Sequence, residues 1–570
     1  MSTTDADVVV VGAGPVGLTL AIDLAGRGID VVVVETRAPD EPPNVKCNHV
    51  AARSMEQYRR LGLVRKLRDA GLPADFPNDV AFRTTVTGIE FARIPIPSRA
   101  KRYTARGGPD TDWPTPEPPH RINQLYFEPI LLAHAASLPN IRFLHRTRVE
   151  GYEAEDGDGT RAAIRVAATD LDRGDPLELR ARYLVGCDGG SSTVRKRMGA
   201  RLEGTPVIQR VQSTFIRAPE LAARIAVPAW STYAANARRC GTVFAIDGRE
   251  TWLIHNHLNP GELDFDAIDR DWAIRTILGV GDAFRYEVIS KEDWVGRRLV
   301  ADRFRAGNVF IAGDAAHLWV PYAGYGMNAG IADATNLAWL LAARLHGWAD
   351  EAILDAYEAE RQPITEQVSR FAMDHAQKMI KARGEVPPRI EAPGREGDRL
   401  RVELGKATYA LNVAQFCCAG LNFGYFYDRS PIVVGDGETA PPYTMGSFSE
   451  STVPGCRAPH FWLPDGRSVY DAFGPGYTLL RFSSAVDADG LVAAAAACRM
   501  PLAILDVDRA ATEVSTAYRH ALVICRADQH VAWRGAHLPA EVYDLVGTLR
   551  GEGQRVRARR KALAWEGVVA

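Results

Sequence analysis

Gly12, Gly14 and Gly17, followed by Glu35, are the residues whose types and spacing point most directly to chemistry. Glycine at the first position permits a tight turn, at the second lets the backbone approach a pyrophosphate, and at the third lets a helix pack closely on a strand. An acidic residue about 20 positions later can accept hydrogen bonds from a ribose. The pattern predicts a site for a dinucleotide, and a βαβ unit with incidental glycines is the structural alternative.

Two further stretches place an aspartate directly after a buried strand. Asp188 precedes a helix that Ser192 is suited to cap, although Asp-Gly-Gly is also ordinary turn chemistry. Asp314 follows the strand Val309–Ile311, and a carboxylate beside glycine-rich backbone suits a polyol hydroxyl. A helix that begins around Gly324–Asn328 would point N–H groups and partial positive charge at an anion or an electron-rich carbonyl.

These residues need strands and helices to position them. Val8–Val11 and Val31–Val34 are short apolar runs, typical of strands that are buried on both faces. The apolar residues between the two runs predict a largely buried helix. Together these segments predict a βαβ unit of an α/β domain.

Changes of composition along the chain predict several domains. Residues 76–119 have few helix signals, and residues 205–300 are rich in β-type and aromatic residues, so we expect both to form a sheet inserted into the nucleotide-binding domain. The expected nucleotide-binding parts are residues 1–75, 120–204 and 301–400, the last including a helical linker. A small α/β domain is expected over residues 401–570.

Composition excludes several classes of protein. The formal net charge of −2 over 570 residues leaves no basic excess for nucleic acid. The 8 cysteines show neither a disulfide framework nor metal-ligand spacing. There is no signal peptide and no apolar run of the roughly 18 residues that a bilayer span requires. We therefore expect a cytoplasmic protein with no nucleic-acid, membrane or metal partner, and either a monomer or a homodimer.

The motifs together resemble those of the class A FAD-dependent aromatic hydroxylases, especially the phenol hydroxylase-like branch. The first motif of that family matches Gly12, Gly14, Gly17 and Glu35, and its Asp-Gly motif matches Asp188, Gly189, Ser192, Val194 and Arg195. Its Gly-Asp motif matches Gly313, Asp314, His317, Pro321, Gly324, Gly326, Asn328, Gly330 and Asp333. The resemblance implies a Rossmann-type FAD-binding domain, an inserted β-sheet substrate domain and a C-terminal thioredoxin-like α/β domain.

The resemblance also implies the cofactor, FAD, and NADPH or NADH as a transient co-substrate. The glycines would face the pyrophosphate, Glu35 the adenosine ribose, Gln124 the flavin side and Asp314 the ribityl chain. Backbone amides of Gly324–Asn328 would face the pyrimidine edge of the flavin, which is negatively charged when reduced. The full cofactor-binding set is Gly12, Gly14, Pro15, Gly17, Glu35, Thr36, Lys46, Gln124, Asp188, Asp314, Gly324, Gly326, Met327 and Asn328.

Two positions depart from the family pattern. Lys46 stands where the family commonly has arginine, which weakens a bidentate contact. Asn48 stands where phenol hydroxylase has an aspartate base, and an asparagine cannot take a proton. The catalytic candidates are therefore Asn48, His49 and Pro321. If a base is needed, the candidates are His49 or a histidine of the inserted sheet.

Residues of the inserted sheet are candidates for the substrate pocket. His255 and His257 share a strand face by their period-two spacing, and Tyr233 is suited to line an aromatic pocket, although packing is the structural alternative for all three. Arg238, Arg239, Arg297 and Arg298 would suit a ring that carries a carboxylate, but surface arginine is the commoner explanation. In the C-terminal domain Cys525 belongs to no Cys-x-x-Cys pair, so we expect that domain to be structural.

The implied reaction is hydroxylation of a phenolic or other small aromatic substrate. NAD(P)H reduces FAD, O2 adds to give a flavin hydroperoxide, and the activated ring attacks its distal oxygen. Baeyer–Villiger-type oxygenation on the same fold and a non-catalytic flavin-binding redox sensor stay open as alternatives. A flavin halogenase is disfavoured because the chain has no Trp-x-Trp-x-Ile-Pro stretch.

Overall fold

The computed structural model describes residues 4–155 and 163–553, and its central layer is an open sheet of eight strands. The main strand order is β14-β15-β8-β1-β2-β5, and the hairpin of β6 and β7 continues from β8. The strands are β1 (Ala6–Val11), β2 (Val31–Val34), β5 (Ile141–Leu144), β6 (Thr147–Ala154), β7 (Ile164–Asp170), β8 (Pro176–Gly186), β14 (Arg305–Ala306) and β15 (Val309–Ile311). Because β15, β8, β1, β2 and β5 run parallel, their carboxyl ends lie at one edge.

The register of this sheet aligns the ends of its central strands. Val11 pairs with Val34 on one side and with Gly186 on the other, and Gly186 pairs in turn with Ile311. The valines of β1 and β2 are buried, as expected for strands covered on both faces. The turns that follow these four ends therefore meet at the edge where doubly wound sheets bind ligands.

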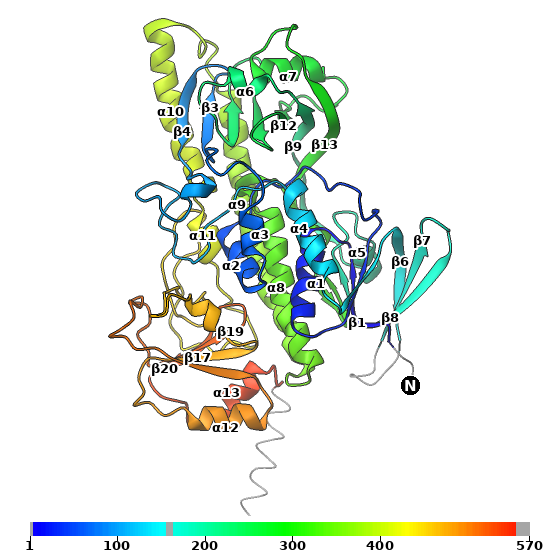
Figure 1. Ribbon diagram of the computed structural model, residues 1–570, viewed down its shortest axis with the longest axis vertical. Coiled ribbons are helices and arrows are strands. Elements are labelled where there is room, and N and C mark those ends of the chain that lie inside the picture. The colour runs from blue at the N-terminus through cyan, green and yellow to red at the C-terminus, as the bar shows by residue number, and fades with distance from the viewer. Residues whose placement is uncertain (1–3, 156–162, 554–570) are drawn as a thin grey trace, which may run out of the picture.

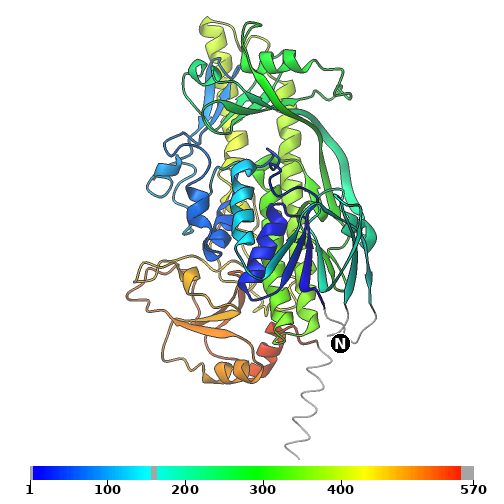
Figure 2. The same ribbon diagram turned by 45° about the vertical axis from the view of Figure 1, so that its right-hand side comes forward.

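Helices pack around this sheet and carry the chain between its strands. In Figures 1 and 2, α1 (Pro15–Gly26) lies beside α4 (Gln124–Ala136) and α8 (Gly326–Leu345), and α1 contacts both. The other helices of this region are α2 (Ala52–Arg60), α3 (Val64–Arg68), η1 (Arg99–Lys101), α5 (Thr193–Met198), η2 (Gly313–Ala315), η3 (Tyr322–Gly324) and η4 (Glu351–Leu354). Within residues 4–155 and 163–553, no helix combines the length and the apolar character needed to cross a membrane.

A second eight-stranded sheet lies at the top of the molecule in Figure 1, with the order β16-β13-β9-β12-β11-β10-β3-β4. Its strands are β3 (Val80–Arg83), β4 (Glu90–Ile94), β9 (Leu202–Arg217), β10 (Ser231–Ala234), β11 (Gly241–Ala245), β12 (Thr251–His257), β13 (Glu287–Ala301) and β16 (His317–Trp319), accompanied by α6 (Leu221–Arg224) and α7 (Arg270–Leu278). The pair β3–β10 is parallel and joins the early segment to the later strands. The long strands β9 and β13 extend down toward the first sheet (Figure 2).

Two long helices, α9 (Asp355–Gly384) and α10 (Gly394–Phe416), pack against the second sheet, α9 on β9, β13 and β16 and α10 on β4. Helix α10 continues without a break across residue 401, where the sequence predicts a domain boundary. Its residue Gly405 packs directly on β4, because a Cβ there would lie only 2.2 Å from the carbonyl oxygen of Phe91. The structure therefore places all of α10 against the second sheet, and the chain enters the C-terminal domain after it.

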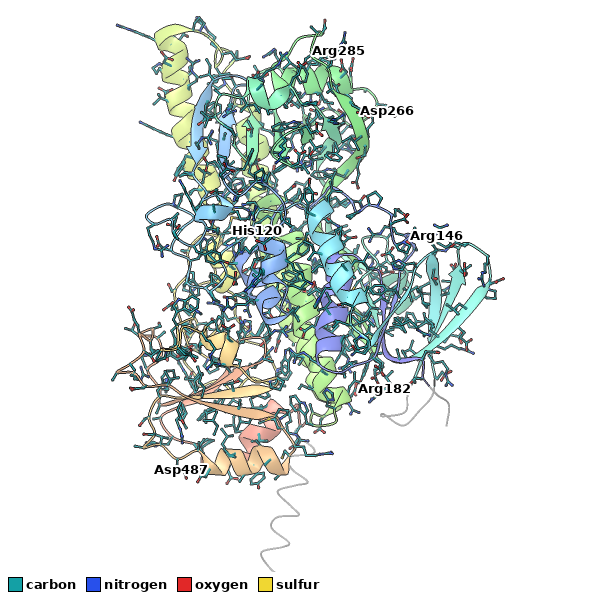
Figure 3. All side chains as sticks on the ribbon, viewed as in Figure 1. His120, Arg146, Arg182, Asp266, Arg285 and Asp487 are labelled. Carbon is teal, nitrogen blue, oxygen red and sulfur yellow. The ribbon has the colours of Figure 1, made fainter. Side chains whose placement is uncertain are left out.

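The C-terminal domain is a four-stranded sheet with the order β18-β17-β19-β20, covered by two helices. Its elements are α11 (Ala419–Phe423), η5 (Val469–Ala472), β17 (Tyr477–Arg481), α12 (Asp489–Ala497), β18 (Leu502–Asp506), β19 (Leu522–Arg526), β20 (Val531–Gly535) and α13 (Val542–Leu549). Figure 3 draws the side chains of this domain, which lies below α2 in that view. The fold class predicted from the sequence is confirmed: an α/β protein with an inserted sheet and a C-terminal α/β domain.

Buried ion pairs hold the C-terminal domain to α9 and α8. Arg526 of β19 pairs with Glu360 of α9 at 2.5 and 2.8 Å, and with Asp528 at 2.6 Å. The Glu360 carboxylate also accepts hydrogen bonds from Asn336 of α8 at 2.7 Å and from Ser430 at 2.6 Å. Because the side chains of Arg526 and Glu360 are fully buried, each charge depends on the other.

We predict that Glu360→Gln destabilises the protein by about 1.5–3 kcal/mol, because it weakens buried charge-assisted hydrogen bonds to Arg526, although Asp528 still pairs with that guanidinium. Urea unfolding followed by tryptophan fluorescence measures the loss. The matched control is Glu403→Gln, which breaks an exposed pair with Arg399 on α10 and should cost about 0–1 kcal/mol. Equal losses in the two variants would contradict the assigned role of Glu360.

Candidate active site

The turn after β1 has one open glycine between two closely packed ones. Gly12 has φ +102°, and a Cβ there would lie 2.5 Å from the carbonyl oxygen of Cys187. A Cβ at Gly17 would lie 2.0 Å from the carbonyl oxygen of Gly12, whereas one at Gly14 would meet no atom within 4 Å. Pro15 starts α1 and has no N–H to satisfy. The open space at Gly14 therefore lies at the N-terminus of α1, where phosphate binds best.

Glu35 lies at the end of β2 and is oriented by backbone amides. Its carboxylate accepts hydrogen bonds from Ala13 N at 2.7 Å and from Arg37 N at 2.9 Å, and the exposed Thr36 hydroxyl donates to it at 3.2 Å. Burial alone would raise the pKa of Glu35, but the amide and guanidinium of Arg37 hold it below its ordinary value. Glu35 is therefore an ionised acceptor fixed at the sheet edge.

Arg37 links Glu35 to α4. Its guanidinium lies 3.4 Å from Glu35 and 2.7 Å from Glu128. Gln124, the first residue of α4, donates to Glu128 at 2.8 Å. The structure thus places the Gln124 amide on the Glu35–Arg37–Glu128 network.

The Asp-Gly motif after β8 stabilises a helix start and ties two turns together. Asp188 Oδ2 accepts hydrogen bonds from Thr193 N at 2.7 Å and Val194 N at 3.2 Å, while its Oδ1 is buried without a hydrogen-bond partner among the described residues. Arg195 donates to the carbonyl oxygens of Gly190 and Ala315, both at 3.0 Å. Asp188 thus satisfies the first turn of α5, and Arg195 joins this turn to the turn after β15.

Two aspartates of the Gly-Asp motif have opposite environments. Asp333 of α8 is fully buried and accepts from Gly313 N at 3.2 Å, His317 at 2.7 Å and Arg361 at 2.9 Å. Burial alone would raise the pKa of Asp333, but His317 and Arg361 hold it below its ordinary value. Asp333 therefore fixes the turn that presents Asp314.

Asp314 is exposed and has no hydrogen bond to any of the described residues. The protein around it nevertheless desolvates the carboxyl and raises its pKa, an effect that His317 and Lys46 oppose. Asp314 is therefore a carboxylate that is exposed on one side and has protein packed around the other. Such a group can accept hydrogen bonds from a bound hydroxyl.

The side chain of Asn328 connects the start of α8 to the loop before α2. Its oxygen accepts from Ala51 N and Ser54 Oγ, both at 2.8 Å, and its amide donates to the carbonyl oxygens of His49 at 3.1 Å and Gly324 at 2.7 Å. The side chain therefore has a structural task. The backbone N–H groups of the first turn, Gly326 and Met327 included, have no acceptor within the helix and remain available to a ligand.

The loop from Lys46 to His49 lies next to these helix starts. Lys46 pairs with Glu292 of β13 at 2.6 Å, and Asn48 accepts from Asn123 at 2.5 Å. His49 is buried, and a Cβ at Gly324 would lie 3.1 Å from its Nδ1. Of these candidates, His49 thus lies against the α8 turn, while the other two side chains are engaged elsewhere.

The candidates on the second sheet lie together on one face. Thr242 pairs opposite both Tyr233 and His255, and its hydroxyl lies 3.0 Å from His257 Nε2. Burial lowers the pKa of His255 to about 4 and takes the pKa of His257 well below its ordinary value, with Arg383 adding to the second effect. Both imidazoles are therefore neutral at pH 7 and weak bases.

Most of the arginines that suggested a carboxylate-bearing substrate already have acidic partners. The pairs are Arg238 with Glu391, Arg239 with Glu262 and Arg298 with Glu366. These three side chains are neutralised within the chain, so none offers a free cation. The described residues also contain no group of three or more His, Cys, Asp and Glu side chains that could hold a metal ion.

Comparison with known protein families agrees with this geometry. The model of a family described as "FAD binding domain" matches residues 5–372, more than half of the chain, and one described as "Aromatic-ring hydroxylase, C-terminal" matches residues 451–551. The chain belongs to the class A FAD-dependent aromatic hydroxylases. The resemblance predicted from the three motifs is confirmed.

Relatives of this hydroxylase align over nearly its full length. The FAD-dependent monooxygenase apdD of Emericella nidulans is 31% identical over 93% of this chain and 87% of its own. The rebeccamycin biosynthetic enzyme RebC with reduced flavin has a TM-score of 0.84 and 34% identity, covering 96% of this chain and 99% of that one. A ternary complex of aklavinone-11 hydroxylase with FAD and aklavinone has a TM-score of 0.78 and 26% identity, covering 97% and 99%.

FAD is the cofactor of this family, and the residues present fit it. Gly14 leaves room for a pyrophosphate at a helix start, and Asp314 offers an exposed acceptor. The first turn of α8 offers unbonded amides. All three features lie in turns at one edge of the sheet, since Gly313 and Gly330 both pack on Val16 of α1.

Sequence reasoning missed residues that complete this arrangement. A Cβ would lie 2.9 Å from Val16 at Gly313 and 2.6 Å from Val16 at Gly330, so two parts of the Gly-Asp motif pack against the first glycine motif at this one side chain. Arg37 was also missed, although a basic residue two positions after the acidic strand end is a visible signal. The role of Val16 has no such signal, because it depends on contacts between distant segments.

Gly14→Ala and Gly17→Ala form a matched pair that separates cofactor binding from folding. We predict that Gly14→Ala keeps the stability of the apoprotein but weakens FAD binding about tenfold or more, because its methyl group enters space free of protein atoms. Gly17→Ala should destabilise the apoprotein itself by about 1–3 kcal/mol or more, because its methyl group overlaps the Gly12 carbonyl.

Thermal unfolding of both apoproteins and calorimetric titration with FAD measure these effects. Unchanged FAD affinity in a folded Gly14→Ala protein would show that the pyrophosphate does not lie at this turn.

Proposed function

We propose that this protein is a monooxygenase that hydroxylates an aromatic ring with O2, using FAD as cofactor and NADPH or NADH as reductant. The observation that carries the proposal is the meeting, at one sheet edge, of the turns that contain Gly14, Asp314 and Gly326. The same four strand ends define the cofactor edge of a doubly wound sheet. No second glycine motif is present, which favours a nicotinamide that binds transiently.

The residues of the chain hold the cofactor along this edge. When bound, FAD supplies hydride acceptance from the nicotinamide and activation of O2. The N-terminus of α1 at Gly14 binds the pyrophosphate, Glu35 accepts from the adenosine ribose, and Asp314 accepts from a ribityl hydroxyl. The first-turn amides of α8 point a fixed partial positive charge at the pyrimidine edge, which stabilises negative charge without reorganisation.

The substrate ring lies between the second sheet and the turn that begins at Pro321. Pro321 is exposed at the start of η3, and Tyr322 behind it is buried against the sheet. Tyr233 stacks near Phe82, with ring centroids 5.2 Å apart, and offers an aromatic wall. Such walls exclude water from the oxygenation site.

His49 is the proposed base that takes the proton of a phenolic substrate. Asn48 has no proton-accepting group and bonds to Asn123. His255 and His257 are weak bases because burial lowers the pKa of each. His49, which lies against the α8 turn at Gly324, is the remaining imidazole among the candidates.

We expect aromatic substrates of the polyketide type to stimulate oxidation of NADPH or NADH by the FAD-loaded protein, with a product heavier by one oxygen atom. The preference for fused rings rests on the aklavinone bound to one relative. The experiment screens phenols, hydroxybenzoates and polyketide aromatics by absorbance and product mass.

Two variants control this experiment. Asp314→Ala should lose FAD and activity, because it removes a charge-assisted hydrogen bond worth about 1.5–3 kcal/mol. Asp374→Ala changes an exposed aspartate of α9 and should behave like wild type.

A lactone or ester product, identified by NMR, would instead indicate Baeyer–Villiger chemistry. Flavin reduction that no aromatic compound stimulates would favour a redox sensor.

His49→Gln should lower turnover about 10²- to 10⁴-fold, the usual contribution of a general base. In the wild type, turnover should fall toward acid pH, where the imidazole is protonated and cannot accept a proton. The variant should lose this acid limb, while its flavin absorbance spectrum confirms an intact cofactor site. His537→Gln, at an exposed position of the C-terminal domain, is the control. A pH profile that is the same in His49→Gln and wild type would exclude His49.

A further inference from the structure

Arg383, in the last turn of α9, lies at the junction of three elements. Its Nη1 donates to the hydroxyl of Tyr322 in η3 at 3.1 Å, and its Nη2 to Gln209 Oε1 of β9 at 3.3 Å. The Tyr322 hydroxyl also donates to Gln209 Oε1, at 3.3 Å. The three side chains thus form a closed triangle that orients the guanidinium.

This guanidinium has no acidic partner among the described residues, since no Asp or Glu oxygen lies within 4.0 Å of it. Two fully buried arginines of α9 and β19 differ in this respect: Arg361 pairs with Asp333 at 2.9 Å and Arg526 with Glu360. Arg383 is also half-buried, so water screens its charge only in part. A cation in this position attracts an anion from outside the chain.

Four titratable side chains near Arg383 are neutral. The positive charge of Arg383 helps to lower the pKa of His257 and of His375, after burial in both cases, and the pKa of His375 falls to about 4. Burial raises the pKa of Tyr233 and of Cys240, so both stay protonated. The Arg383 guanidinium therefore lies among neutral donors and acceptors, with Lys378 of α9 as a second cation that acts on His375.

Arg383 lies next to the turn that begins at Pro321, where the substrate ring is proposed to bind. Tyr322, which bonds to Arg383, directly follows Pro321, and it packs in the same apolar cluster as Tyr233. His375 of α9 also contacts Tyr322, with ring centroids 5.2 Å apart. A planar ring held between the second sheet and η3 would therefore have its edge at Arg383.

We propose that Arg383, oriented by Gln209 and Tyr322, is the subsite that binds an anionic oxygen of the aromatic substrate. The oxygen belongs to a carboxylate or to an ionised phenol or enol on the ring system. A guanidinium fork matches both, since two parallel N–H groups bind two oxygens of a carboxylate or two neighbouring ring oxygens. The assignment rests on the proposed hydroxylase function and specifies the class of substrate.

Probe binding to the FAD-loaded protein tests this subsite without any reductant. The probes are anthraquinone-2-carboxylate, its neutral carboxamide, and alizarin above and below the pH at which its phenol ionises. Perturbation of the flavin absorbance gives each Kd. We expect the wild type to bind the carboxylate, or ionised alizarin, about tenfold or more tightly than the matching neutral form.

The variants are Arg383→Gln, Arg383→Lys and, as a control, Arg370→Gln. Arg383→Gln should abolish the preference for the anionic form while the Kd of the neutral carboxamide stays unchanged, and Arg383→Lys should retain part of it. Arg370 lies on the same helix with its side chain 64% exposed, and its variant should keep the wild-type preference. A merely structural role would change the Kd of neutral and anionic probes alike.

The two anionic arms distinguish a carboxylate subsite from a phenolate subsite, and preference for either supports the proposal. Equal affinity of the wild type for charged and neutral probes, or no binding of any probe, would overturn it. A preference that survives in Arg383→Gln would also overturn it. Because binding is measured without NADPH or turnover, failure of hydroxylation in the activity screen is a separate result.

Discussion

The carboxamide of Asn328 is bonded to three separate segments at once, and the geometry of the cofactor edge depends on it. It links the η3 turn at Gly324, the loop at His49 and Ala51, and the start of α2 at Ser54. A carboxamide can satisfy four such bonds only when every partner is in place. The first turn of α8 is thereby held still, and its amides keep one direction toward the ligand.

The two aspartates of the Gly-Asp motif have different tasks, since one stabilises the turn and the other is placed to bind a ligand. Asp333 and Asp314 are both carboxylates, but His317 and Arg361 keep the pKa of the first low despite its burial, while desolvation raises the pKa of the second, which has no hydrogen-bonded partner among the described residues. The paired group stabilises the turn. The unpaired group costs the protein some stability and leaves an acceptor for a ligand.

The motif residues were predictable from the sequence because local backbone geometry demands them. Gly12 adopts a positive φ, and Gly17 touches the Gly12 carbonyl five residues back, so the spacing itself carries the information. Two contacts join positions that are far apart in the chain, that of Val16 with Gly330 and that of Arg526 with Glu360. The lack of an acidic partner at Arg383 among the described residues likewise depends on how distant segments pack. No periodicity or spacing encodes them, and the arginines that looked available, such as Arg239, proved to be paired.

Helix α9 touches all three domains within a single element. Glu360 meets the C-terminal domain and Arg361 meets α8, while Arg383 reaches η3 and β9 some 22 residues later, or about 33 Å along the axis. One helix thus connects α8, which carries the Gly-Asp motif, to the second sheet. A chimera that takes its second sheet from a relative should therefore take α9 and α10 from the same relative. A junction inside α9 would change how the helix aligns with α8 at one end and with the second sheet at the other.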